Sequence, residues 1–211
     1  MGTKPQELNF PATIAKEIIN ELPLSRYDGP IELVSTPGEM HVAVAELKKE
    51  KILGFDTETR PSFRRGKSYP PALLQLGGAD KVFLFQLLKL EDISPALEIL
   101  ASPGIVKVGV AIRDDVRKLR ERQDFKPAGF VELADITHKL DIVNTGLRSL
   151  AAIFLNVRIS KGAQVSNWSR EHLTDAQTVY AATDAWISRE IYMRLLELGL
   201  DKSGTNNHSA D

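Results

Sequence analysis

The stretch KILGFDTE, residues 51–58, determines how the rest of this chain is interpreted. It begins as a continuous apolar run, which is typical of a strand in the middle of a sheet. Asp56 and Glu58 follow at the end of that run, and residues two apart on a strand point to the same side. Open α/β sheets bind ligands beyond the carboxyl ends of their strands. The stretch therefore predicts a central strand that presents two carboxylates together.

Strands are also predicted on both sides of this stretch. Five further segments have the composition of strands, at residues 31–35, 71–78, 81–87, 104–111 and 130–134. Helix-forming segments separate the early strands and dominate the second half of the chain. This order indicates an α/β fold with a mixed sheet.

Capping residues predict where several of these helices begin and end. Thr36 and Thr145 are expected N-caps of helices over 36–50 and 145–156. A capping box of Thr174 and Gln177 starts a long helix that closes near residue 199. Asn9 is the expected start of a first helix, which ends before residue 23.

Length and composition restrict the class of protein. With 211 residues, 43% of them hydrophobic and 26% charged, the chain is expected to form one substantial globular domain. It has no apolar run long enough for a membrane span and no leader-like start, so we expect a cytoplasmic protein without a membrane partner. The net charge of −1 means that any nucleic-acid binding must rest on local basic patches or on metal ions. The absence of cysteine excludes thiolate metal sites.

The acid pair itself suggests a metal site. Two adjacent carboxylates repel each other, which raises a pKa unless a cation lies between them. Hard cations such as Mg²⁺ or Mn²⁺ prefer such oxygen ligands. The alternative is a solvated strand end in which Glu58 simply faces water.

Two further acid clusters follow later in the chain. In VGVAIRDDVRKL, residues 108–119, Asp114 and Asp115 lie just beyond a strand, in the first turn of a helix. In YAATDAW, residues 180–186, Tyr180 and Asp184 share one face of the long helix. An Asp at a helix start is often only a cap, and a buried Asp is often only a hydrogen-bond acceptor. Asp184 nevertheless lies on a core-facing stripe, where an Asp is costly unless it is paired or metal-bound.

Together the three clusters resemble the motifs of the DEDD superfamily of 3′–5′ exonucleases, in its tyrosine subclass. The surrounding stretches FVELADI, GLRSLAAIFL and SNWSREHLTDAQTVYAATDA are similar to Werner-type exonuclease domains, and ribonuclease D shares the same motifs. The resemblance covers residues 31 to 198 approximately. It implies a ribonuclease H-like fold with a five-stranded mixed sheet flanked by helices.

The resemblance also implies a role for each matching residue. Four acids match the ligands of two divalent cations, Mg²⁺ or Mn²⁺, and a tyrosine matches the residue that orients the attacking water. The implied catalytic set is Asp56, Glu58, Asp115, Tyr180 and Asp184. Asp114 is then a neighbouring helix cap. The implied reaction is hydrolysis of the last phosphodiester at a 3′ end, which releases nucleoside monophosphates.

Contacts with the nucleic-acid strand are expected near this set. The expected contact residues are Thr57, Arg60, Arg65, Lys67, Arg117 and Trp168. The basic residues among them could meet phosphates, although a solvated charged surface is the alternative. Arg117 stands where Werner-type domains carry an aromatic residue, so its contact would be ionic. Trp168 could stack on a base or pack structurally.

The domain plan and the substrate are expectations as well. Residues 1–30 are an N-terminal extension with a short helix, 31–199 the exonuclease domain and 200–211 a disordered tail. Werner-type resemblance favours DNA, and the chain is too short for the helical domains that follow the nuclease in ribonuclease D. An RNA-trimming exoribonuclease and a non-catalytic nucleic-acid-binding protein on the same fold are the alternatives. A glycosidase is disfavoured because Asp56 and Glu58 share one side of one strand.

Overall fold

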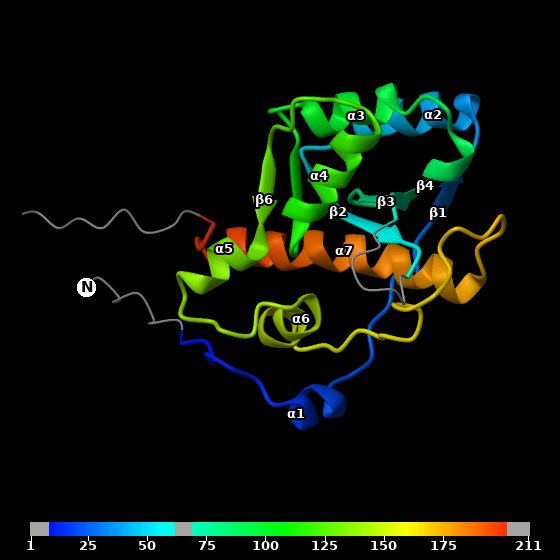
Figure 1. Cartoon of the computed structure of the whole chain (residues 1–211). Helices are drawn as coiled ribbons and strands as arrows, with labels where there is room; N and C mark the ends of the chain where they lie inside the picture. The colour runs from blue at the N-terminus through cyan, green and yellow to red at the C-terminus, as the bar shows by residue number, and fades with distance from the viewer. Residues whose placement is uncertain (1–8, 62–68, 202–211) are drawn as a thin grey trace, which may run out of the picture.

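A mixed sheet lies between two groups of helices in the computed structural model, which describes residues 9–61 and 69–201 (Figure 1). The order of its six strands is β1-β4-β3-β2-β5-β6. Their bounds are β1 Ile31–Val34, β2 Ile52–Thr59, β3 Pro71–Gly77, β4 Val82–Gln86, β5 Val106–Gly109 and β6 Phe130–Glu132. β2 lies inside the sheet, antiparallel to β3 and parallel to β5. The predicted α/β fold with a mixed sheet is confirmed.

The strand count differs from the five that the resemblance implied, whereas the sequence pattern predicted six. The sixth, predicted at residues 130–134, is β6, which pairs in parallel with β5 at one edge of the sheet. Its three residues are all half-buried, and α5 follows without a gap. A strand this short carries little pattern of its own, so its pairing depends on the neighbouring β5.

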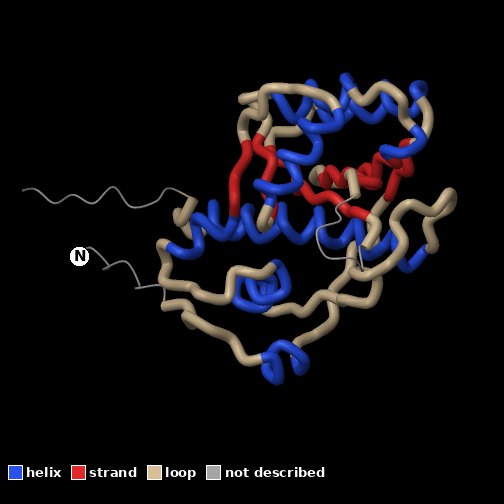
Figure 2. Tube along the Cα trace, viewed as in Figure 1, coloured by secondary structure: helices blue, strands red, loops and turns tan. Residues whose placement is uncertain are grey.

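Helices cover both faces of the sheet. The helix bounds are α1 Lys16–Glu21, α2 Pro37–Leu47, α3 Ser94–Ala101, α4 Ile112–Arg122, α5 Leu133–His138, α6 Leu147–Leu155 and α7 Asp175–Glu197, with a short 3₁₀ turn η1 at Leu87–Lys89. α2, α3 and α4 share one hydrophobic core with one face of the sheet. α5 and α7 pack on the other face, α6 packs against α7, and α1 lies beyond α6 (Figures 1 and 2).

Local capping rules predicted two of these helix starts. The Thr36 capping box with Glu39 opens α2, and the Thr174 capping box with Gln177 opens α7. Gly199 follows α7 with a positive φ of 69°, a conformation that glycine adopts without strain.

Two predicted helix starts are wrong. α6 begins after Gly146 rather than Thr145, because the amide of Thr145 donates to the carbonyl of Val143 and is held in a turn. α1 begins at Lys16 rather than near Asn9, because the preceding residues run in extended form and bond to the loop before α6. The first eight residues and most of the predicted tail lie outside the described residues. No helix in the described part is long and apolar enough to cross a membrane.

Candidate active site

The acid pair lies on the face of β2 that α7 covers. Leu53 and Phe55 are fully buried in the core on the opposite face. Strand geometry therefore turns the alternate residues, Asp56 and Glu58, toward α7. The β2–β3 ladder shifts its register between Glu58 and Thr59, so regular pairing ends directly after the two carboxylates.

Helix α7 approaches β2 closely enough to bring a third carboxylate to this pair. Gly54 and Gly77 are neighbours in the β2–β3 ladder. A Cβ at Gly54 would lie 1.7 Å from the carbonyl oxygen of Ala185, so the helix backbone occupies the space of the missing side chain. Asp184 precedes Ala185 on α7 and is buried, with 6% exposure.

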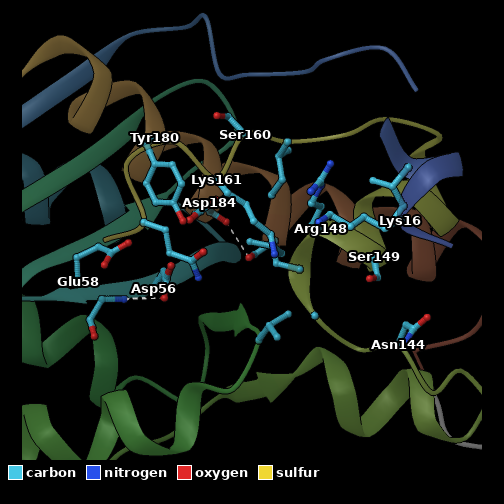
Figure 3. Close-up of a pocket in the computed structure, with 18 of the residues that line it drawn as sticks. Lys16, Asp56, Glu58, Asn144, Arg148, Ser149, Ser160, Lys161, Tyr180 and Asp184 are labelled. Carbon is cyan, nitrogen blue, oxygen red and sulfur yellow. Dashed lines mark hydrogen bonds between the residues drawn. The ribbon is translucent and has the colours of Figure 1, made fainter. Parts of the chain in front are cut away.

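Three carboxylates converge as a result. Asp56, Glu58 and Asp184 each offer an oxygen, and these oxygens all lie within 4.8 Å of one another. Figure 3 shows the three side chains together at one end of a cleft. Carboxylate oxygens at such separations suit a hard divalent cation, so this donor set fits Mg²⁺ or Mn²⁺.

Asp115 reaches the same region from α4. Its Oδ1 accepts a hydrogen bond of 2.5 Å from the hydroxyl of Thr57. α4 starts after Ala111, whose φ of 59° turns the chain sharply at the end of β5. The carboxylate of Glu132 accepts hydrogen bonds from Ala111 and the next amide, both at 2.9 Å. Glu132 thus bonds the amides at this helix start, and the prediction that Asp114 is the N-cap is wrong.

We call Asp56, Glu58, Asp115 and Asp184 the acid cluster. Burial raises the pKa of Asp56 well above its usual value, and Asp184 and Asp115 raise it further. Burial raises the pKa of Glu58 to about 9, and the other three acids contribute. Burial also raises the pKa of Asp184, although a hydrogen bond with Tyr180 opposes the rise. A divalent cation would lower these raised pKa values, because it stabilises the ionised form of each ligand.

Tyr180 lies one turn before Asp184 on α7 and shares a side-chain hydrogen bond with it. Burial, reinforced by the nearby carboxylates, raises the pKa of the phenol above its ordinary value. Tyr180 is therefore protonated near neutral pH and cannot serve as a base. Its hydroxyl is a hydrogen-bonding group that can orient a water molecule.

The predicted nucleic-acid contacts fall into different environments. Arg65 and Lys67 lie outside the described residues. Thr57 is buried and bonded to Asp115. Trp168 has 2% exposure and packs beside Tyr180, with ring centroids 6.0 Å apart. Of the two alternatives for Trp168, stacking on a base or packing structurally, the structure has the second.

The other two predicted contacts are exposed arginines. The guanidinium of Arg60 lies over the ring of Tyr69, 5.3 Å from its centroid. Arg117 pairs with Asp114 and Glu121 on its own helix. The charge of Arg117 is therefore already compensated on α4, and a phosphate contact by either arginine stays a prediction.

The acid cluster forms one end of a cleft of about 540 Å³ that sequence reasoning did not anticipate. Lys16 of α1 and Arg148 and Ser149 of α6 line the side away from the acid cluster, and Lys161 also lines the cleft; we call these four residues the basic wall (Figure 3). The only available signal was Arg148 and Ser149 in the first turn of a predicted helix, where free amides favour anions. Lys16 carried no such signal, because only the folded chain brings α1 to this cleft.

Comparisons with known proteins identify relatives of this chain. The family model for 3′–5′ exonucleases matches residues 31–199. The bifunctional 3′–5′ exonuclease/ATP-dependent helicase WRN of Mus musculus is 36% identical over 154 residues, which cover 70% of this chain and 11% of that protein. Ribonuclease D of Haemophilus influenzae is 32% identical over 174 residues, 81% of this chain and 42% of that protein. The chain thus spans less than half the length of either relative.

A solved structure supports the fold. The EXO domain of Nibbler from Aedes aegypti has a TM-score of 0.75 at 18% identity, over 82% of this chain and 92% of that chain. At this low sequence identity, the likeness is evidence for the fold alone.

The family match and the named relatives identify a nuclease of the hydrolase class. More specifically, the chain belongs to the family of 3′–5′ exonucleases of the DEDD type, and its fold is ribonuclease H-like. Membership implies divalent metal ions and a nucleic-acid substrate. The acid cluster supplies the oxygen donors that such ions require.

Proposed function

We propose that this chain uses two divalent cations, Mg²⁺ or Mn²⁺, to hydrolyse the terminal phosphodiester at the 3′ end of a nucleic-acid strand, with DNA favoured. Nucleoside monophosphates are the products. The observation that carries the proposal is the convergence of Asp56, Glu58 and Asp184 within 4.8 Å, beside the hydroxyl of Tyr180. Residues 31–199 form the proposed catalytic domain, and residues 1–30 its N-terminal extension.

Each residue of the site has a distinct part in this proposal. Asp56, Glu58 and Asp184 hold the cations, and Asp115 completes the ligand set from α4. When bound, the cations make a water molecule more acidic and stabilise negative charge on the reacting phosphate. Tyr180 stays protonated, and its hydroxyl donates a hydrogen bond to Asp184. The lone pairs of its oxygen remain available to accept a hydrogen bond from the attacking water and so orient it.

Thr57 acts through Asp115. Its hydroxyl donates to Oδ1 of that carboxylate, which fixes the orientation of the side chain and leaves Oδ2 for a cation. The backbone amide of Thr57 also donates to Oδ1 of Asp56 at 2.9 Å. One residue therefore orients two of the four proposed ligands, which restricts both before a cation arrives.

DNA is proposed over RNA because of the likeness to the exonuclease part of WRN. The alternative is RNA trimming of the ribonuclease D type, which the relative from Haemophilus influenzae favours. Both substrates present the same scissile phosphate to the acid cluster. They differ at the ribose 2′-hydroxyl, which is the group that lets a protein distinguish them.

A time course with 5′-labelled strands tests the proposal. The substrates are 3′-recessed duplex DNA, single-stranded DNA and single-stranded RNA, each with Mg²⁺, Mn²⁺ or EDTA. We expect a ladder that shortens from the 3′ end, that disappears in EDTA and in the Asp56→Ala/Glu58→Ala variant, and that develops faster on DNA. Faster shortening of RNA would overturn the substrate preference. No cleavage with either metal would contradict the exonuclease proposal and favour the binding protein.

A further inference from the structure

The N-terminal segment forms part of the cleft wall although it precedes the family match at residue 31. Its extended part is bonded to the loop before α6. The amide of Val143 donates to the carbonyl of Ala12 at 2.7 Å, and the amide of Ile14 donates to Oδ1 of Asn144 at 3.0 Å. These bonds join regions far apart in the sequence, so the position of this segment is fixed by tertiary contacts.

Further bonds hold α1 against the start of α6. The guanidinium of Arg148 donates to Oδ1 of Asn20 at 2.5 Å. Ile19 is buried, with 5% exposure, and lines the cleft. Beyond α1, the carbonyl of Pro23 accepts from the amide of Arg158 at 3.0 Å. Lys16 is therefore an exposed cation on an anchored helix, directed at the cleft as Figure 3 shows.

The basic wall has the chemistry of an anion site. Its three cations come from three separate segments, and within residues 9–61 and 69–201 neither Lys16 nor Lys161 makes an ion pair. α6 starts at Gly146 without a side-chain cap. The amide of Ser149 donates to the carbonyl of Gly146, whereas the amides of Leu147 and Arg148 have no partner among the described residues and are open to a ligand. The Nε atom of Arg148 is buried and has no hydrogen-bond partner among the described residues. These donors together favour a phosphate group.

The chemistry of the reaction identifies which phosphate this is. At a 3′-hydroxyl end, the terminal nucleotide has no phosphate beyond the scissile one, which the acid cluster and its cations would hold. Cations elsewhere in the cleft can therefore meet only phosphates on the 5′ side of the scissile bond. We propose that Lys16, with Arg148 and the open start of α6, binds a backbone phosphate of the strand upstream of the scissile bond. This inference rests on the proposed exonuclease function.

Substrates of two lengths test the inference. A 5′-hydroxyl dinucleotide has only the scissile phosphate, whereas a single strand of about eight nucleotides extends along the cleft. We expect Lys16→Gln to raise KM for the longer strand about 3- to 10-fold and to change the dinucleotide reaction by less than about 2-fold. The plot of log KM against log salt concentration should lose about 0.7 of its slope, which corresponds to one phosphate contact on a single strand. Lys16→Glu should produce a larger rise.

The matched control is Lys49→Gln, which removes an exposed lysine two residues after the end of α2, on the other side of the sheet. It should leave both substrates and the salt slope unchanged. Equal KM values for Lys16→Gln and Lys49→Gln would overturn the inference, and so would an equal loss on the dinucleotide. Anisotropy of the labelled longer strand measures binding without turnover. If the wild-type chain hydrolysed neither substrate, the exonuclease proposal would fail, while weaker binding by Lys16→Gln than by Lys49→Gln would still support the phosphate contact.

Discussion

The acid cluster and the basic wall line one cleft but are built in different ways. The acid cluster is half-buried, with Asp184 buried, and comes from β2, α4 and α7. β2 and α7 approach closely through Gly54 and Ala185. The basic wall is more exposed and comes from a short helix, a helix start and a loop. Catalytic ligands need positions fixed to a fraction of an ångström, whereas binding of a backbone phosphate requires mainly a positive charge at the right place along the cleft. The two sides should therefore respond differently to substitution.

The largest expected effect is on the acid cluster. Asp56→Asn keeps the shape of the side chain but removes the charge of a proposed cation ligand. We expect kcat to fall on the order of 10³-fold, because the charge stabilisation of the transition state depends on the cations. Steady-state hydrolysis of the labelled strand measures this effect.

The same variant should bind the strand at least as tightly as the wild type in EDTA, because the basic wall is intact and one repulsive charge is gone. Circular dichroism serves as the folding control. Retention of more than a tenth of wild-type kcat would show that Asp56 is not an essential ligand.

The next largest effect concerns the close approach that builds the acid cluster. Gly54→Ala places a methyl group where the carbonyl of Ala185 lies, so β2 and α7 must separate. We expect a loss of about 3 kcal/mol or more in the free energy of unfolding, measured by chemical denaturation. Gly38→Ala is the matched control, because a Cβ at Gly38 in α2 meets nothing within 4 Å. That variant should be slightly more stable than the wild type, and equal stabilities of the two variants would refute the packing argument.

Tyr180→Phe should have a smaller effect on rate. The substitution keeps the ring that packs beside Trp168 and removes only the hydroxyl that we propose orients the water. We expect kcat to fall roughly 10- to 100-fold, less than for a cation ligand, with affinity for Mn²⁺ nearly unchanged. Tyr192→Phe on the same helix is the control, since Tyr192 is buried in the core away from the cleft. If both variants lost the same activity, the effect would come from helix packing.

The acid cluster was predictable from the sequence, whereas the basic wall was not. Asp56 and Asp184 stand out because they occupy positions where the local pattern calls for apolar or core residues. The capping box of Thr174 likewise marked the start of α7, because its signal is local. Lys16 looks like any surface lysine, and its place in the cleft depends on tertiary hydrogen bonds such as that between Val143 and Ala12.

Short or irregular segments failed for a related reason. The first helix begins at Lys16 rather than near Asn9, because the residues before it bond to the loop before α6. The cap of α4 comes from Glu132, which is distant in sequence, so the local candidate Asp114 was the wrong choice. In each case a partner far along the chain determines the local structure.

The smallest expected effect is on the free energy of unfolding, which substitutions on the two sides of the cleft should change differently. The pKa of Glu58 is raised by burial from 4.5 to about 9. Below pH 4.5 the side chain is protonated in both the folded and the unfolded chain, so its ionisation does not change the free energy of unfolding. As pH rises toward 9, the unfolded chain releases this proton while the metal-free folded protein retains it, so folding becomes less favourable. Glu58→Gln removes the titrating group and should stabilise the metal-free protein at pH 9 by roughly 1–2 kcal/mol, with a smaller gain at pH 5.

Urea denaturation in EDTA at the two pH values measures this difference. Saturating Mn²⁺ should reverse the order, because the wild-type carboxylate binds the cation and the amide does not. Lys16→Gln, on the exposed basic wall, should change stability by less than about 0.5 kcal/mol at either pH. A Glu58→Gln protein that is less stable than the wild type at pH 9 without metal would contradict the strain that we assign to the acid cluster. The two sides of the cleft would then differ in their chemistry but not in how much they lower the free energy of unfolding.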